Sequence, residues 1–369
     1  MKFFVMIILI CFSLFAQPIQ AIRGVWLTNV DSEVLNSKEG IVEAVNLCKE
    51  LKINTICVVT WNKAMTTYPS KIAKSVTGIE INPIWQGRDP LKELIEEAHK
   101  ENIKVIAWFE FGFSSSYNED GVIILKNRPQ WKAIDNHGKL VKKNGFEWMN
   151  GFHPDVQQFM LDLILEVVRN YDIDGIQGDD RLPALPSSAG YDDYTVKLYK
   201  KEHKGKIPPQ NNKDEKWIQW RANLLNQYME RIYKEVKSIK PNVLVTMAPS
   251  IYPWSKEEYL QDWPTWVENG WVDFIFPQLY RYKIEDYQKV LKEVVQEQIS
   301  EENLNKFYPG LLIKVGNKYP DEVFLREMIQ SNRNLGVNGE VFFFYEDLKK
   351  FKNVLLEIYK DDNVIFPLK

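Results

Sequence analysis

The segment 174–181, DGIQGDDR, is the feature that most limits what this chain can fold into. It has the pattern of a buried β-strand that ends in two carboxylates, Asp179 and Asp180, and a guanidinium, Arg181. Charged groups are costly to bury unless they are paired or take part in chemistry. The segment therefore predicts a sheet in which the end of one strand carries a functional site.

The rest of the chain alternates short apolar runs with amphipathic helical patterns. The expected strands are 23–29, 54–61, 103–111, 173–180, 242–249, 271–280, 307–315 and 339–346. The expected helices are 39–51, 90–101, 155–170, 215–239, 284–299, 321–335 and 348–359, with a weaker one within 256–268 that Pro264 interrupts. Eight strands alternating with eight helices predict an α/β fold, a closed (β/α)8 TIM barrel that forms a single catalytic domain.

In such barrels the working face is built from the C-terminal ends of the strands and the loops that follow them. Polar residues gather at these positions here: the third strand ends in Glu110, the sixth in Tyr280, the seventh in Lys314 and the eighth in Glu346. The longest insertions follow the third and fourth strands. We expect them to wall a cleft above the barrel.

Composition narrows the class of partner. The 47 basic and 50 acidic residues give a formal net charge of −3, without a basic block that could follow a phosphate backbone, so nucleic acid is not expected as a partner. The 12 Trp, 17 Tyr and 19 Phe suit a large core, and flat aromatic faces are also what sugar rings stack on. The favoured partner is a polysaccharide or oligosaccharide.

Residues 1–21 resemble an export signal. Lys2 precedes an apolar run, 3–15, that is too short to span a bilayer, and Ala21 offers a small residue for cleavage. Cys11 lies within the run, but Ile10 before it is bulkier than a lipoprotein signal favours, so secretion is preferred over a lipid anchor. We expect a mature domain of residues 22–369 that is secreted or periplasmic and has no membrane span. Its Cys48 and Cys57 are expected to be buried thiols.

Strand alternation predicts which acids point inward. Gln177 shares a strand face with Asp179, and a polar Gln fits the barrel interior better than an apolar helix interface. Asp179 should therefore face the barrel axis, while Asp180 has the opposite parity. The leading hypothesis makes Asp179 the nucleophile or base and Glu110 the general acid, with Asp180 and Glu346 in reserve. Asp180 could instead pair with Arg181 or cap the following loop, and Glu346 could be a first-turn helix acid.

Two nearby carboxylates beside aromatic platforms suit cleavage of a glycosidic bond. One acid protonates the leaving oxygen, and the other attacks or stabilises the developing oxocarbenium ion. Burial and a second carboxylate would raise the pKa of the acid, while Arg181 or Lys314 would keep the other group ionised. The residues expected to bind substrate are Trp26, Asn29, Trp61, Trp108, Asn150, His153, Arg181, Trp254, Gln278, Tyr280, Lys314, Tyr345 and Glu346.

Two of these residues have equally simple structural interpretations. His153 could cap the helix that follows it instead of binding a hydroxyl group, and Lys314 could extend along the barrel rim. The four His residues, with no paired Cys motif, give no usual metal-ligand spacing, so neither a metal nor another cofactor is expected. A hard cation held by Asp179 and Asp180 is the remaining alternative. Phosphate-loop and Gly-x-Ser-x-Gly motifs are absent from the sequence.

Several segments together resemble the bacterial envelope glycosyl-hydrolase-like family described as family 10-like. They are RGVWLTN at 23–29, WFE at 108–110, WMN at 148–150 with His153-Pro154, DGIQGDDR at 174–181, PSIYPW at 249–254, PQLY at 277–280 and 310–316. The resemblance implies an eight-stranded barrel that hydrolyses a glycan, which in some relatives is peptidoglycan freed of its stem peptides. It matches Asp179 and Asp180 to the family pattern, whereas many members have Asn in place of Glu110.

A second function from another class fits the same fold. A barrel protein that binds glycans without cleaving them would keep the aromatic cleft but would not need both Asp179 and Asp180. A glycan deacetylase would normally need a metal site, which the sequence does not provide.

Overall fold

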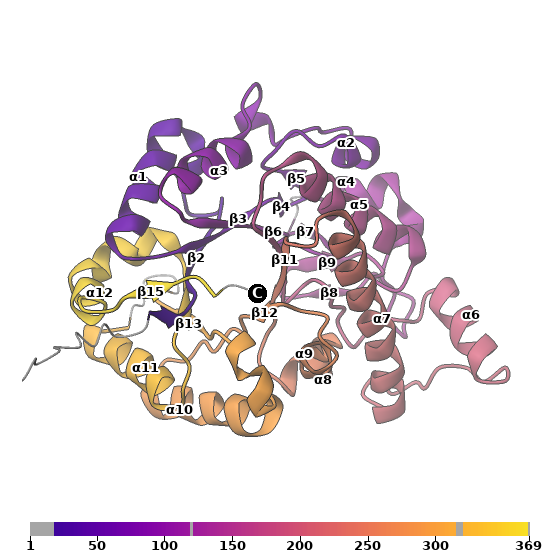
Figure 1. Cartoon of the computed structure of the whole chain (residues 1–369). Coiled ribbons are helices and arrows are strands. Elements are labelled where there is room, and N and C mark those ends of the chain that lie inside the picture. Colours follow the sequence, from indigo (N-terminus) through magenta and orange to yellow (C-terminus); the bar gives the residue numbers. More distant parts are fainter. Residues whose placement is uncertain (1–17, 119–120, 315–319, 368–369) are drawn as a thin grey trace, which may run out of the picture.

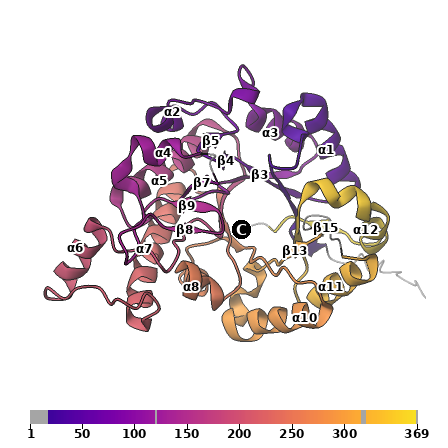
Figure 2. The ribbon, with the colours of Figure 1, turned by 180° about the vertical axis from the view of Figure 1, so that it is seen from behind.

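A ring of eight parallel strands forms the centre of the molecule, and helices surround it (Figure 1 and Figure 2). The computed structural model describes residues 18–118, 121–314 and 320–367. The barrel strands are β2 (Arg23–Leu27), β3 (Thr55–Val59), β6 (Lys104–Trp108), β10 (Gly175–Asp179), β11 (Leu244–Ala248), β12 (Phe274–Ile275), β13 (Gly310–Leu312) and β14 (Glu340–Phe343). Each lies within an expected strand, so the predicted α/β barrel is confirmed.

The two edges of the strand ladder meet and close the ring. Neighbouring strands follow the order β12-β11-β10-β6-β3-β2-β14-β13, all paired in parallel. The edge strands β12 and β13 are joined by the parallel bridges Ile275–Phe307 and Gln278–Gly310. Closure leaves the C-terminal ends of all eight strands on one face.

Several of the helices around the barrel begin directly after a capping residue. The main ones are α1 (Lys38–Glu50), α3 (Pro90–Lys100), α5 (Pro154–Asn170), α7 (Glu215–Ile239), α8 (Trp254–Tyr259), α9 (Trp263–Glu268), α10 (Ile284–Glu293), α11 (Glu322–Asn334) and α12 (Lys352–Ile358). The side chains of Ser37, Asp89, Asp214 and Asp321 accept backbone N–H bonds at the starts of α1, α3, α7 and α11. Such caps stabilise a helix start by about 1 kcal/mol each.

A polar layer crosses the interior of the barrel. The indole Nε1 of Trp26 on β2 donates to Oε1 of Gln177 on β10 at 2.7 Å, and Gln177 Nε2 donates to Thr246 Oγ1 on β11 at 3.1 Å. All three residues are buried. Gln177 therefore points into the barrel, and by strand alternation so does Asp179, two residues later.

The insertions after the third and fourth strands carry secondary structure that was not predicted. A small antiparallel sheet of β7 (Ser114–Tyr117), β8 (Lys142–Lys143) and β9 (Phe146–Trp148), together with α4 (Ile123–Asn127), follows β6. Helix α6 (Asp193–Glu202) follows β10 and lies outside the ring of barrel helices (Figure 1). Helix α2 (Lys71–Thr77) and the hairpin β4 (Trp61–Asn62) and β5 (Met65–Thr66) follow β3.

Two helical boundaries differ from the expectation. In place of the one helix expected within 256–268 there are two short helices, α8 and α9. Leu260 adopts a left-handed conformation at the end of α8, and Pro264 lies in the first turn of α9. After β14 the chain enters a 3₁₀ helix, Tyr345–Phe351, instead of continuing as a strand to Glu346. This turn changes where Tyr345 and Glu346 lie.

The chain ends pair with each other. Strand β1 (Ile19–Gln20) pairs with β15 (Val364–Ile365), and the fully buried Ala21 donates its N–H to Ile365 O and accepts from Asn54 Nδ2. The predicted boundary of the export signal, between residues 21 and 22, stays a prediction. Most of the expected export signal, including Cys11, lies outside the described residues.

Two further properties concern the described part of the chain as a whole. No helix there has the length and apolar character to cross a membrane. Cys48 and Cys57 are free, buried thiols, as expected, and burial raises the pKa of Cys48 to about 12. Neither thiol is therefore disposed to react as a thiolate near neutral pH.

Candidate active site

Asp179 is the last residue of β10, and its side chain is 2% exposed at the C-terminal mouth of the barrel. Three donors surround its carboxylate. Oδ2 accepts from Trp108 Nε1 at 3.2 Å and from Arg181 Nη2 at 3.1 Å, and Oδ1 accepts from the Arg181 backbone N–H at 3.0 Å. Hydrogen bonds of this kind stabilise the ionised form of a buried carboxylate.

Glu110 follows the neighbouring strand β6, and its side chain is 15% exposed. Oε2 accepts from Asn62 Nδ2 at 2.5 Å, whereas Oε1 lies 3.6 Å from Arg181 Nη2. The second contact is an ion pair that is too long for a hydrogen bond. Glu110 therefore receives fewer donors than Asp179.

Arg181 links all three candidate acids. Besides its contacts with Asp179 and Glu110, its Nη1 lies 3.0 Å from Asp180 Oδ1, and its Nε donates to the backbone oxygen of Glu110 at 2.9 Å. Its guanidinium carbon lies 4.9 Å from the ring centroid of Phe146. The nitrogen atoms of the guanidinium are thus held by acids and a backbone carbonyl, and the group also lies near an aromatic ring.

The backbone around Arg181 is fixed by the insertion after β6. The Arg181 carbonyl accepts from Phe113 N–H at 2.9 Å. Gly112 has a φ of +48°, and a Cβ there would lie 2.2 Å from the Arg181 carbonyl oxygen. Only glycine permits this close approach of the two loops.

Burial dominates the ionisation of the two acids. It raises the pKa of Glu110, against the lowering effects of Arg181 and of the Asn62 hydrogen bond. It also raises the pKa of Asp179 well above its usual range, with Arg181 opposing and Asp180 and Glu110 reinforcing the shift. The carboxylates together raise the pKa of Arg181 despite its desolvation. The buried acids therefore resist being ionised together, so the cluster tends to retain a proton.

A compact pocket of about 160 Å³ opens onto these groups. Its lining residues come from strand ends around the barrel and are Trp26, Trp108, Glu110, Asp179, Asp180, Arg181, Gln278, Tyr280 and Phe343. Gln278 is held by a 2.9 Å bond from its Nε2 to Ala248 O, and the Tyr280 ring lies 5.5 Å from that of Phe343. The pocket thus brings together Glu110 after the third barrel strand, Asp179 at the end of the fourth and Tyr280 after the sixth, with aromatic rings around the acids.

Trp254 lies at the edge of this region and not in the pocket. It is 43% exposed and packs on Tyr259, with ring centroids 5.4 Å apart. Burial and then the charge of Asp180 raise the pKa of Tyr259 to about 12, so Tyr259 lies within electrostatic reach of the acids. Trp254 is thus an exposed aromatic face that packs on Tyr259 and is not among the residues that line the pocket.

The structure does not bring three of the predicted binding residues to the pocket. Trp61 is fully buried, packs edge-on against Phe159 and donates to Gly112 O. Asn150 is buried and donates to Thr195 Oγ1 at 3.2 Å. His153 caps α5 by accepting the N–H of Asp155 at 3.2 Å. These contacts give each residue a structural role.

Lys314, Tyr345 and Glu346, which follow the seventh and eighth barrel strands, are also not among the residues that line the pocket. Lys314 pairs with Asp347 at 3.5 Å, and Glu346 accepts from Ser32 Oγ at 2.6 Å. Tyr345 and Glu346 line a separate, acidic cavity of about 830 Å³ beside α1. Asn29 lies outside the pocket lining, and its Oδ1 is buried without a hydrogen-bond partner.

Two residues of the site were not predicted from the sequence. Phe343 lines the pocket between Trp26 and Tyr280, with centroids 6.1 and 5.5 Å from theirs. Asn62 supplies the side-chain hydrogen bond to Glu110. Phe343 lies in an apolar strand whose sequence does not distinguish a pocket residue from a core residue. Asn62 lies in a hairpin that the sequence pattern did not predict.

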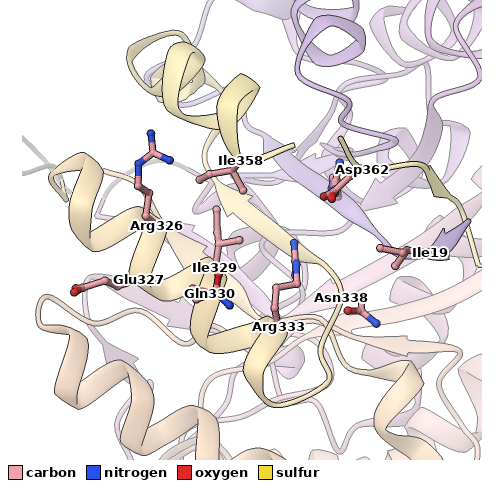
Figure 3. Close-up of a pocket in the computed structure, with 10 residues that line it drawn as sticks. Ile19, Arg326, Glu327, Ile329, Gln330, Arg333, Asn338, Ile358 and Asp362 are labelled. Atoms are coloured by element: carbon pink, nitrogen blue, oxygen red, sulfur yellow. The ribbon is translucent and has the colours of Figure 1, made fainter. Parts of the chain in front are cut away.

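Another cavity, of about 530 Å³, lies at the opposite end of the barrel between α11 and the chain ends (Figure 3). Arg333, Asp362 and Arg23 are among the residues that line it. Arg333 pairs with Glu340, and Arg23 pairs with Asp362. This end of a barrel usually serves stability, and these four side chains are already paired with one another. Within the described residues, no group of three or more His, Cys, Asp or Glu side chains is placed to hold a metal ion.

Comparison with solved structures supports the fold. The glycoside hydrolase domain of PgaB (BpsB) from Bordetella bronchiseptica superposes with a TM-score of 0.68 at 14% identity, covering 94% of this chain and 100% of that one. Likeness at this identity concerns architecture alone.

Comparison with curated sequences extends over most of the chain. Glycosyl hydrolase DigH of Escherichia coli K12 is 27% identical over 307 residues, covering 72% of this chain and 66% of that protein. Glycosyl hydrolase YngK of Bacillus subtilis is 24% identical over 387 residues, covering 91% of this chain and 70% of that protein. The chain thus spans about two thirds of the length of these relatives.

The family comparison covers the barrel and its site together. The family described as "Glycosyl hydrolase-like 10" matches residues 21–319, a range that runs from the start of β2 past β13 and contains Asp179, Glu110 and Arg181. This range includes every strand of the barrel except β14. By this match the chain belongs to the glycosyl hydrolase-like 10 family.

Proposed function

We propose that this protein is a secreted glycoside hydrolase that cleaves O-glycosidic bonds of a polysaccharide by carboxylate acid/base catalysis. Asp179 acts as the nucleophile or base, Glu110 as the general acid, and Arg181 as the residue that positions both. The observation that carries the proposal is the buried pair of carboxyl groups, joined by one guanidinium, in a pocket with aromatic walls. Family membership supports the same chemistry.

The distribution of donors supports the assignment of roles. Asp179 has three hydrogen-bond donors, one of them charged, which favour its carboxylate form. Glu110 has one neutral donor and a longer contact with Arg181, and its pKa is raised mainly by burial. Burial raises the pKa of Asp179 as well, so the assignment depends on the donors: because the carboxylate form of Asp179 has more of them, we assign the proton that the coupled pair retains to Glu110, from which it can pass to a leaving oxygen.

Asp180 has a supporting role in this scheme. Its ion pair at 3.0 Å is with Arg181 Nη1, whereas Nη2 contacts Asp179 and Glu110. The structural alternative considered from the sequence, a pair with Arg181, is thus realised. Asp180 remains the reserve for the acid role because it also lines the pocket.

Peptidoglycan glycan strands freed of stem peptides are the proposed substrate, on the resemblance of the sequence motifs. The expected export signal would deliver the protein to the envelope, where this polymer occurs. The scheme needs no cofactor and no nucleic acid. The aromatic rings around the pocket supply the surfaces on which sugar rings stack.

The proposal is tested by incubating the purified protein with these glycan strands and measuring new reducing ends. We expect reducing ends to accumulate in proportion to enzyme and time. A matched control is Asp172→Asn, which alters a side chain that is 92% exposed before β10 and should leave the rate within about twofold. Binding without release would instead support the glycan-binding barrel and contradict the enzyme.

A further inference from the structure

We infer that hydrolysis retains the configuration of the anomeric carbon and passes through a glycosyl ester on Asp179, an inference that rests on the proposed function. What carries it is the geometry of Arg181. A single atom, Nη2, lies 3.1 Å from Asp179 Oδ2 and 3.6 Å from Glu110 Oε1. One nitrogen therefore fixes the spacing of the two catalytic carboxyl groups.

The distance between Asp179 Oδ2 and Glu110 Oε1 cannot exceed the sum of their two distances to Arg181 Nη2. In inverting glycosidases the two catalytic carboxyl groups are at least about 6.5 Å apart, and in retaining ones they are about 5 to 5.5 Å apart. The largest separation that the two contacts of Arg181 Nη2 allow is only slightly longer than about 6.5 Å. The separation would reach this limit only if Asp179 Oδ2, Arg181 Nη2 and Glu110 Oε1 lay in a straight line, and any bend at Nη2 makes it shorter. The spacing therefore falls on the retaining side.

The surroundings of the pair hold this spacing. Arg181 is bound through its backbone N–H, its Nε and both terminal nitrogens, and its plane packs near Phe146. Trp108 holds Asp179 from the neighbouring strand, and Asn62 holds Glu110. The pocket of about 160 Å³ is small compared with the 300 Å³ or more that is typical of ligand sites. Little space is left for the water that an inverting enzyme keeps between base and sugar.

The chemical steps follow from these positions. The Asp179 carboxylate forms a bond to the anomeric carbon as the glycosidic C–O bond breaks, and the Glu110 carboxyl gives its proton to the departing oxygen. Glu110, now a carboxylate, then takes a proton from water while the water oxygen bonds to the anomeric carbon and the Asp179 ester bond breaks. The sum is one glycosidic bond and one water converted into two hydroxyl groups, with both acids restored.

The direct test is proton NMR of the first product released by the unmodified protein from denuded peptidoglycan strands, whose sugars are β-linked. We expect the β anomer of the new reducing end to appear first and to mutarotate later. An α anomer appearing first would overturn the inference and leave the hydrolase intact. No reducing ends at all would overturn the proposed function, and this inference with it.

A second experiment identifies the nucleophile. In Asp179→Ala the shortened side chain leaves room for azide, which can attack the anomeric carbon directly in the presence of the same glycan strands. We expect the α-glycosyl azide as product, because azide then replaces Asp179 in a single displacement. A β-glycosyl azide, or hydrolysis by this variant at the unmodified rate, would show that another group attacks and would overturn the ester on Asp179.

Discussion

Replacing Asp179 by asparagine is expected to lower kcat/KM for glycan hydrolysis by about 10³-fold or more, because the amide cannot attack or accept a proton at the anomeric centre. Asparagine keeps the shape of the side chain and an oxygen that can accept from Trp108 and Arg181. The loss should therefore be one of chemistry and not of folding. Reducing-end release by the variant and the unmodified protein, at matched concentrations of folded protein, measures it.

The same variant is expected to be more stable than the unmodified protein at neutral pH. Burial raises the pKa of Asp179 above its value in the unfolded chain. Because Asp179 and Glu110 resist being ionised together, the folded cluster keeps one proton, on Glu110 in the proposed scheme, at pH values where the unfolded chain has released both, so folding stability falls as pH rises through that range. Asparagine removes this penalty, while Arg181 keeps Asp180 and Glu110 as partners.

Thermal unfolding of both proteins at two pH values measures the effect. The melting temperature of Asp179→Asn should exceed that of the unmodified protein near pH 7, and the difference should shrink as pH falls towards about 4, where an unfolded aspartate is itself protonated. An inactive variant that is also less stable at pH 7 would mean that Asp179 is mainly structural. Near-normal turnover would remove it from the mechanism.

Replacing Glu110 by glutamine is expected to lower kcat/KM by about 10² to 10⁴-fold on glycan strands, the usual contribution of a general acid. Substrates whose leaving group needs no protonation should lose much less. Because Glu110 must carry a proton to act, the rate of the unmodified protein should fall as pH rises through its pKa, which burial raises from the ordinary value. That alkaline decline should be absent in the variant.

Glu346→Gln provides the matched control for Glu110. Glu346 lies at the same end of the barrel but in the separate cavity beside α1, bonded to Ser32. We expect its replacement to change kcat/KM by less than about twofold. If Glu346→Gln lost activity and Glu110→Gln did not, the acid would lie in the other cavity and the assignment would be wrong.

The direction in which Asp179 points could be predicted from the alternation of side chains along the strand. The polar Gln177 in an otherwise apolar strand indicated which face pointed into the barrel, and its bonds to Trp26 and Thr246 lie there. Asp179 shares that face. Alternation could be used because β10 pairs without a bulge with β11 up to Asp179 and with β6 up to Gln177.

Alternation failed where strands ended sooner than expected. Trp61 was expected at the end of a strand, but β3 stops at Val59, and the chain turns into the β4–β5 hairpin, which directs Trp61 onto Phe159 of α5. Glu346 was expected to end β14, but the 3₁₀ helix that starts at Tyr345 carries it towards Ser32. Apolar periodicity locates strands but not the residue at which each one leaves the barrel.

Arg181 shows a different limit. The sequence placed it beside two acids, yet its link to Glu110 depends on the loop after β6 folding back over β10. That approach rests on Gly112, whose missing side chain admits the Arg181 carbonyl. Contacts between loops of different strands leave no periodic signal, so the link between Arg181 and Glu110 could be found only in the structure.

The structure of the Asp179→Asn variant with a bound glycan oligosaccharide would test the central claim most directly. The account predicts a sugar ring in the pocket beside Phe343, with its anomeric carbon next to residue 179 and the glycosidic oxygen within hydrogen-bond reach of Glu110. An oligosaccharide bound instead in the acidic cavity beside α1, or with no glycosidic oxygen near either acid, would contradict it.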